Sequence, residues 1–188
     1  MLIRLFENYP FKNTGMTVAE GFLAYSGNLR TVPGMPHGGI DYVLKKGDEF
    51  ASFEIFSMYE GSVKFGVSDK YGKFFSISKI EGDFLYETVY AHIDNIPDDI
   101  LKYAIIQGDK DFIIPAAYPL GWAARDSKNI RHLHVELHQK NLLSGVRRKL
   151  DPYGLYEKFL NNNYPQPGES LKNYDHVWVD DDPLFIGD

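Results

Sequence analysis

The most informative segment of this sequence is Arg131-His132-Leu133-His134-Val135-Glu136-Leu137-His138. Read with a period of two, it places the leucines and the valine on one face and the histidines and the glutamate on the other. Alternation around a β-branched valine favours a strand. A helix is the alternative, because His134 and His138 are four residues apart and could share a metal on one helix face. A half-buried strand whose polar face only meets water is the plainer explanation of the same pattern.

The segments before this stretch predict an antiparallel β architecture. Glycine and aspartate turns separate several short runs of strand character, which cover residues 37–44, 50–59, 61–67, 74–80 and 84–92. Two further runs, 112–115 and 118–124, have irregular or strand character. We therefore expect an all-β fold with a minor helix, built as a compact antiparallel sheet or sandwich.

Two short helices are expected outside these strands. Residues 95–104 carry Pro97 and two aspartates near their start and continue with apolar residues at helical spacing. Residues 151–160 could close the domain with one or two helical turns.

The composition is that of one folded domain with a core. The 188 residues are 44% hydrophobic and carry a net charge of −6, which disfavours nucleic acid and an anionic membrane as the main partner. No cysteine is present, so thiol nucleophiles, disulfides and sulfur-ligated zinc are excluded. No apolar run has the length of a membrane span, and nothing in the sequence demands more than a monomer. Residues 1–10 lack the apolar region and the cleavage site of a secretory signal.

His37 and Asp41 form a first candidate pair for metal binding. They are four residues apart, and a fully extended chain would separate them by about 13–14 Å, too far for two ligands of one ion. Gly38 and Gly39 lie between them, and glycine permits a bend that brings both side chains together. We therefore interpret the pair as two ligands supplied across a tight turn.

The histidines of the 131–138 stretch complete a candidate catalytic metal site. A catalytic zinc ion takes three nitrogen or oxygen ligands and keeps its fourth position for water. His37, Asp41 and either His132 or His134 supply that set. The other strand histidine would lie about 6–7 Å along the same face, too far to ligate and near enough to reach a metal-bound water. With His92, which follows a strand at 88–91, it would provide a general base and a charged group for a developing oxyanion.

These residues resemble the three motifs of the lysostaphin-type (LytM-like) zinc metallopeptidases, in the same order. The motifs are His37-x-Gly39-x-Asp41, Tyr90-Ala91-His92 and His132-Leu133-His134-Val135-Glu136. The resemblance implies that His37, Asp41 and His134 hold one zinc ion. It also implies that His132 is the general base and that His92 steadies the oxyanion.

The resemblance covers residues 17–156 and includes further similar positions at 60–63, 71–72 and 151–153. We therefore expect a lead-in at residues 1–16, a metallopeptidase catalytic domain at 17–160 and a C-terminal tail at 161–188. The tail, which has two prolines and an acidic end, is expected to lie over the domain surface or to be partly loose. Its aspartate run fits a solvated charged segment, with a metal role as the alternative.

The family hydrolyses peptide bonds of bacterial peptidoglycan, next to glycine or in stem-peptide cross-links. The resemblance therefore favours a location in the cell wall, in the periplasm or outside the cell. By resemblance we expect a zinc metalloendopeptidase with a peptidoglycan peptide as its partner. Its activity should be lost below about pH 6, as free imidazoles and zinc ligands become protonated. Two alternatives stay open: a non-catalytic member that binds a wall peptide or regulates a partner hydrolase, and a zinc hydrolase with another peptide substrate.

Two features depart from the family's pattern. The approach to the last motif, residues 120–131, carries bulky and charged residues where the family has glycine and small residues. We therefore expect a different groove wall and a different preferred peptide. His138 has no counterpart in the motif, and we interpret it as a surface histidine or one that lies behind the metal ligands, with direct ligation as the alternative.

Overall fold

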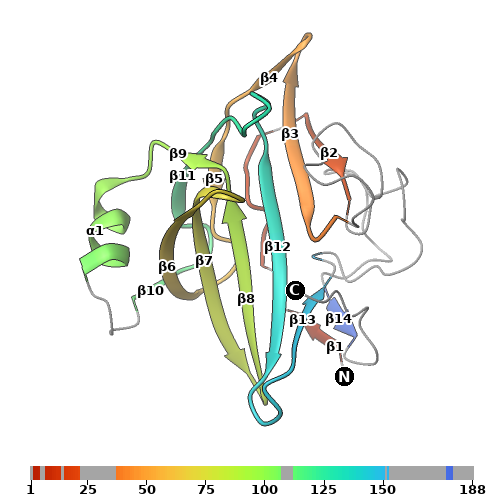
Figure 1. The fold of residues 1–188 in the computed structure, drawn as a ribbon, viewed down its shortest axis with the longest axis vertical. Coiled ribbons are helices and arrows are strands. Elements are labelled where there is room, and N and C mark those ends of the chain that lie inside the picture. Colours follow the sequence, from red (N-terminus) through yellow and green to blue (C-terminus); the bar gives the residue numbers. More distant parts are fainter. Residues whose placement is uncertain are drawn as a thin grey trace.

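Antiparallel strands account for most of the regular structure of this protein. The computed structural model describes residues 2–4, 7–13, 15–21, 37–106, 112–150, 152 and 177–179. Within them every strand pair is antiparallel, and the one helix is α1 (Asp98–Ile106) (Figure 1). The predicted all-β fold class with a minor helix is thus confirmed. Among the described residues, no helix has the length and apolar character required to span a membrane.

A nine-stranded sheet forms the body of the molecule, with the strand order β10-β6-β7-β8-β12-β3-β2, while β13 pairs with β12 and β4 with β3. Its strands are β2 (Met16–Glu20), β3 (Ile40–Lys46), β4 (Glu49–Ala51), β6 (Gly61–Ser68), β7 (Gly72–Glu81), β8 (Phe84–Ala91), β10 (Ile113–Ile114), β12 (Leu133–Asn141) and β13 (Arg147–Leu150). The long strand β12 lies in its centre, between β3 and β8 (Figure 1).

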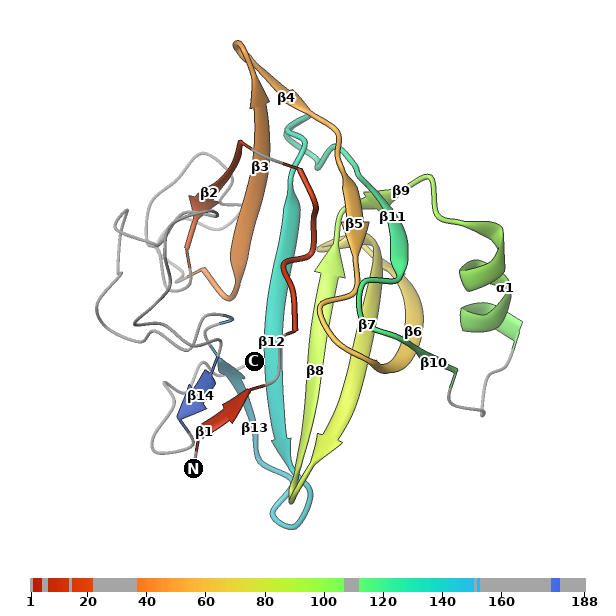
Figure 2. The same ribbon diagram turned by 180° about the vertical axis from the view of Figure 1, so that it is seen from behind.

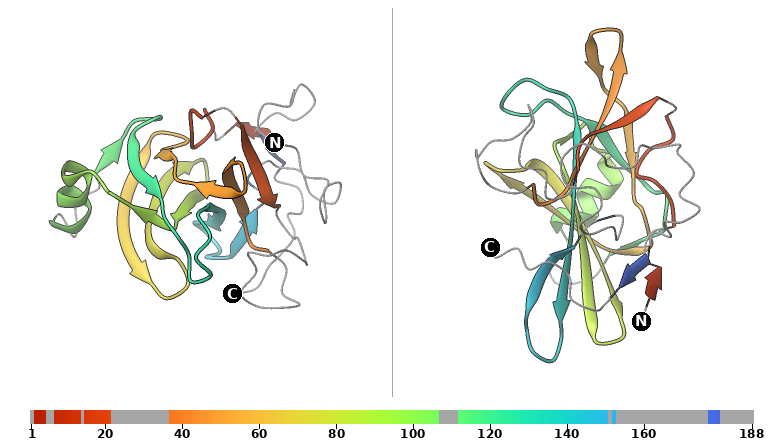
Figure 3. Two further views of the ribbon diagram at one scale, coloured as in Figure 1. Left: turned by 90° about the horizontal axis from the view of Figure 1, so that it is seen from above. Right: turned by 90° about the vertical axis from the view of Figure 1, so that its right-hand side faces the viewer.

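Two smaller sheets complete the structure. β5 (Glu54–Phe56), β11 (Pro119–Ala123) and β9 (Ile93–Asp94) form a three-stranded sheet, and β1 (Leu2–Arg4) pairs with β14 (Val177–Val179). From behind, β5 and β11 lie across one face of the large sheet (Figure 2). Figure 3 shows the same layering from above and from the side.

From Leu133 onward the 131–138 stretch is part of the strand β12, as its alternation predicted, so the helical alternative is wrong. The predicted helix at 95–104 is observed as α1, two to three residues later. The single strand expected at 50–59 is wrong in one respect, because it divides into β4 and β5, which belong to different sheets. Between them, the Ser52 hydroxyl donates to the carbonyl of Ala123 and Phe53 is fully buried, so the chain crosses there from one sheet to the other.

The predicted helix at 151–160 lies outside the described residues except for position 152. Of the predicted tail at 161–188, the structure describes only β14. At the other end, Phe11 is 8% exposed and packs edge-on against Tyr42, with ring centroids 5.0 Å apart. The core therefore already includes residues before position 17, while the predicted domain boundaries stay predictions.

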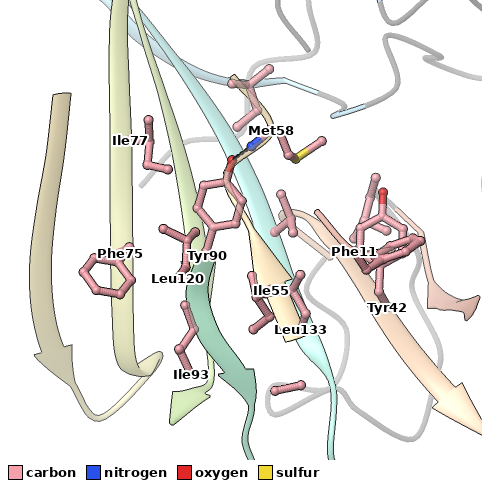
Figure 4. Packing of buried hydrophobic residues seen from close by; sticks show 14 of the residues in the cluster. Phe11, Tyr42, Ile55, Met58, Phe75, Ile77, Tyr90, Ile93, Leu120 and Leu133 are labelled. Atoms are coloured by element: carbon pink, nitrogen blue, oxygen red, sulfur yellow. Dashed lines mark hydrogen bonds between the residues drawn. The ribbon is translucent and has the colours of Figure 1, made fainter. Parts of the chain in front are cut away.

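The hydrophobic core lies between the large sheet and the small one (Figure 4). Leu133, Val135 and Leu137 of β12 are fully buried on this inner face. Burial of each such side chain contributes about 1.5–3 kcal/mol. Ile55 and Leu120 of the small sheet are also fully buried in this core. Strand alternation therefore leaves the polar residues of β12 on the opposite face, which the small sheet does not cover.

Candidate metal centre

Strand register places an aspartate directly beside a histidine on the outer face of the large sheet. In the antiparallel pairing of β3 and β12, Asp41 lies opposite His134. Side chains of opposed residues project from the same face of a sheet. The Nδ1 atom of His134 lies 2.7 Å from Oδ1 of Asp41, and both residues are buried.

His37 reaches the same carboxylate from the segment that precedes β3. Its Nδ1–H donates to the carbonyl oxygen of Gly21 at 2.9 Å, which leaves the lone pair of Nε2 facing the site. Nε2 lies 3.3 Å from Oδ1 of Asp41 and 3.1 Å from Nδ1 of His134. The structure therefore brings the two predicted ligands together across the turn.

Close approach to β12 explains the glycine at position 39. A Cβ atom there would lie 2.9 Å from the carbonyl carbon of Val135 and would collide with its oxygen. The backbone of Gly39 is not in the left-handed region. The turn thus needs glycine for space rather than for an unusual backbone angle, which differs from the reason given by the sequence.

The ligand atoms of His37, Asp41 and His134 lie within 4.8 Å of one another, so this group could hold a metal ion. Two nitrogens and one carboxylate oxygen are a donor set that zinc accepts. Tetrahedral zinc with bonds of about 2.05 Å would separate its ligand atoms by about 3.4 Å. The three observed separations, 2.7, 3.1 and 3.3 Å, would therefore need to open only slightly. In the described part of the chain this is the one group of three such side chains that converges in this way.

The two predicted catalytic histidines lie beside this group. His132 immediately precedes β12, is 3% exposed, and has its Nε2 atom 4.0 Å from Oδ1 of Asp41. His92 follows β8, and its ring centroid lies 4.5 Å from that of His132. All five predicted site residues thus occupy one place in the structure, while their roles stay predictions.

His92 has an unusual backbone conformation for a residue that is not glycine. Its φ of 60° is left-handed, a geometry that is held by two backbone hydrogen bonds. The N–H of His92 donates to the carbonyl of Tyr71 at 2.9 Å, and its carbonyl accepts from the N–H of Ala124 at 2.8 Å. These contacts end β8 at Ala91 and orient the His92 ring toward His132.

Burial and neighbouring charges shift the pKa values of Asp41 and His134 in opposite directions. Burial would raise the pKa of Asp41, but the interactions with His37 and His134 outweigh it and hold that pKa well below its usual value. Burial would lower the pKa of His134, whereas Asp41 and Glu136 raise it to about 9. Without a metal, the His134 ring is therefore protonated at neutral pH, with a carboxylate at each nitrogen.

Burial, followed by the neighbouring histidines His132 and His134, lowers the pKa of His92 to about 4. The imidazole of His92 is therefore neutral at pH 6. The expected protonation of free imidazoles near pH 6 therefore does not apply to His92, and an acid loss of activity would have to come from other groups.

Sequence reasoning missed the part played by Glu136. This carboxylate is 1% exposed, accepts hydrogen bonds from four side chains and forms an ion pair with a fifth; the four are His134, His138, Lys70 and Tyr71, and the fifth is Lys149. Positive and polar neighbours, His134 and His138 foremost, outweigh burial and hold its pKa far below the usual range. The alternation of the strand placed Glu136 on the polar face, but no local pattern pointed to the two lysines.

His138 is half-buried and lies behind the ligands. Its Nε2–H donates to Oε2 of Glu136 at 2.8 Å, and it is not part of the converging group. Its position fits the interpretation made from the sequence, in which it supports the site without belonging to the ligand set.

Comparison with known proteins gave structural matches alone. No family model matches the chain, and no curated protein matches it. Among solved structures it is similar to the antimicrobial peptidase lysostaphin from Staphylococcus simulans, with 15% identity, a TM-score of 0.48, and coverage of 86% of this chain and 61% of that one. It is also similar to a protein of Pseudomonas aeruginosa described as peptidase M23, with 17% identity, a TM-score of 0.40, and coverage of 71% and 46%.

The chain therefore spans 61% and 46% of the lengths of these two proteins.

Proposed function

We propose that this chain is a zinc metalloendopeptidase that hydrolyses peptide bonds of bacterial peptidoglycan, in stem-peptide cross-links or glycine-containing bridges. The observation that carries the proposal is the convergence of His37 Nε2, Asp41 Oδ1 and His134 Nδ1 beside two further histidines that do not belong to the ligand set. A structural zinc site would fill its fourth position with another side chain, whereas a catalytic one keeps it for water.

Zinc bound by these three residues would polarise the scissile carbonyl and make a water molecule more acidic. The chain's own residues would then accept the proton of the water and stabilise the negative charge that develops on the carbonyl oxygen. His132, whose Nε2 atom lies 4.0 Å from Oδ1 of Asp41, would accept the proton of the attacking water as general base.

His92 would stabilise the developing oxyanion. Because its pKa is about 4, its ring is neutral at working pH and offers an N–H as a hydrogen-bond donor, rather than the charged group expected from the sequence. The hydrogen bonds from its backbone to Tyr71 and Ala124 would fix the direction of that donor.

The segment before the last motif supports a peptide preference that differs from that of the family. Its residues form an ordered turn next to His132: Oδ1 of Asp126 accepts from the N–H groups of Lys128 and Ile130, and Arg125 donates to the carbonyl of Asn129. Trp122, just before this turn, is 42% exposed. These bulky and charged groups would contact the substrate where the family carries small residues.

A digest of purified peptidoglycan tests the proposal. Peptidoglycan from bacteria with different cross-bridges is incubated with the zinc-loaded protein, with and without a zinc chelator, and new amino termini are identified by mass spectrometry. We expect chelator-sensitive termini that return when zinc is restored and that are absent with His132→Ala.

Zinc-loaded protein that cleaves no peptidoglycan would refute the peptidoglycan substrate. Cleavage that persists in the chelator, or that His132→Ala leaves intact while the fold and the zinc are retained, would refute the mechanism.

A further inference from the structure

We propose that Glu136 is a positioning residue of the candidate metal centre, which fixes the ring of His134 so that Nδ1 and not Nε2 faces the ion. The inference rests on the proposed metal site and concerns a residue that is outside its ligand set.

The contact with His134 is direct. Its Nε2–H donates to Oε1 of Glu136 at 3.0 Å, while Nδ1, on the other side of the ring, lies 2.7 Å from Asp41. A half-turn of the ring would exchange its nitrogen edge for its carbon edge and break both contacts. With the proton of Nε2 held by Glu136, a metal ion that displaces the proton of Nδ1 would meet the lone pair of Nδ1 at the position between Asp41 and His37.

Glu136 is itself held from two separate parts of the fold. Lys70 and Tyr71, in the turn between β6 and β7, donate to Oε1 at 3.2 Å and to Oε2 at 2.8 Å. His138 of β12 and Lys149 of β13 approach Oε2 at 2.8 and 3.2 Å. Since an ionised carboxylate offers about four acceptor positions, these donors and His134 fill them.

This saturation explains why Glu136 would support the ligand without competing for the ion. The two lysines offset the desolvation of a buried carboxylate, so it stays charged although it is 1% exposed. A charged acceptor at Nε2–H increases the basicity of Nδ1 and thereby its affinity for a metal. The turn that carries Tyr71 also fixes His92, through the backbone carbonyl of Tyr71, so one segment would align a ligand and a catalytic residue.

Zinc affinity of a charge-neutral variant tests the assignment, with a matched control on the neighbouring strand. Glu136→Gln keeps the shape and one acceptor oxygen and removes the charge. Glu87→Gln removes the same charge from β8, opposite His138 on the same face of the sheet, without a contact to His134. Affinity is measured by competition with a chromogenic chelator, and folding by circular dichroism.

We expect Glu136→Gln to bind zinc about 10–100-fold more weakly than the parent. Glu87→Gln should change the affinity by about twofold or less, because a charge farther from the ion is largely screened. Unchanged affinity in folded Glu136→Gln, or an equal loss in both variants, would overturn the proposal.

A spectroscopic readout needs no substitution at Glu136. In nitrogen-15 spectra of the zinc-loaded parent, we expect a histidine bound through Nδ1 with its proton on Nε2, and this signal should be absent in His134→Gln. Binding of His134 through Nε2 would overturn the proposal.

If Glu136→Gln does not fold, a double variant with Lys70→Met and Tyr71→Phe tests the assignment instead, because these substitutions remove two of the donors that hold Glu136. The double variant should bind zinc at least about threefold more weakly, and unchanged affinity would count against the assignment. If the parent protein binds no zinc, the proposed function is refuted. If the parent binds zinc and the variants bind it equally well, the role of Glu136 is refuted and the proposed function is not.

Discussion

Raising the pH is expected to destabilise the metal-free protein through one residue, His134. Its pKa rises from 6.5 to about 9 in the folded state, because Asp41 and Glu136 stabilise the charged ring more than burial destabilises it. Each pKa unit between the folded and unfolded states corresponds to about 1.4 kcal/mol, so this residue contributes about 3 kcal/mol to the free energy of unfolding.

The direction follows from the sign of the pKa change. A raised pKa means that the folded state holds the proton more tightly, so the contribution is complete below pH 6.5 and is lost as the pH rises through about 9. Asp41 behaves in the opposite way. Its lowered pKa gives a contribution that is complete above pH 3.8 and is lost as the pH falls below that value. The metal-free protein should therefore be most stable in mildly acidic solution.

Urea denaturation in the presence of a chelator measures this effect, at about pH 6.5 and about pH 9.5. We expect the free energy of unfolding to fall by about 3 kcal/mol between the two values. His134→Gln serves as the control, because it lacks the titrating ring and should show a much smaller fall. Zinc-loaded protein should also show a smaller fall, since the metal requires a neutral ring. Equal stability of the metal-free protein at both values, or the same fall in His134→Gln, would refute the reasoning.

Further substitutions test separate parts of the structure. His132→Ala and His92→Ala should each reduce peptidoglycan cleavage by about 10²–10⁴-fold while zinc content, measured by atomic emission, is retained; loss of zinc would instead place that histidine among the ligands. Gly39→Ala should destabilise the protein by about 1–3 kcal/mol in urea denaturation, because its methyl group meets the backbone of β12, whereas at Gly38 the nearest atom is the end of a flexible lysine side chain. Equal effects of alanine at the two glycines would contradict the close approach. Phe75→Ala, at a fully buried position, should cost about 3–5 kcal/mol in the same assay, and a change below about 1 kcal/mol would show that the ring is not packed.

Local pattern was sufficient to predict most of the strands but not their partners. The alternation of residues 133–137 predicted both the strand β12 and its buried face, and turn residues separated β6, β7 and β8. No local pattern shows that β12 pairs with β3 on one side and β8 on the other, because such pairings join residues far apart in the sequence. The division of 50–59 into two strands was missed for the same reason, since it depends on which sheet each half joins.

The sequence predicted which residues form the site. It did not predict the pKa shifts and charge pairs that arise when these residues come together. Spacing alone left His132 and His134 as equal candidates for the third ligand; the structure separates them, because only His134 lies opposite Asp41 in the pairing of β3 and β12. The lysines around Glu136 come from the β6–β7 turn and from β13, which sequence distance does not connect to the motif. The low pKa of His92 depends on burial, which a sequence motif does not report.

The pair of Asp41 and His134 connects the stability of the fold to the proposed chemistry. In the metal-free protein the proton on Nδ1 of His134 neutralises Asp41, at the place where an ion would do so. Zinc must displace that proton, so its apparent affinity should fall about tenfold for each pH unit below about 9. In the proposed enzyme, loss of activity in acid would then follow from protonation of a ligand and not from His92, whose ring stays neutral down to about pH 4. The carboxylates that hold His134 in place thus also set how strongly protons compete with the metal.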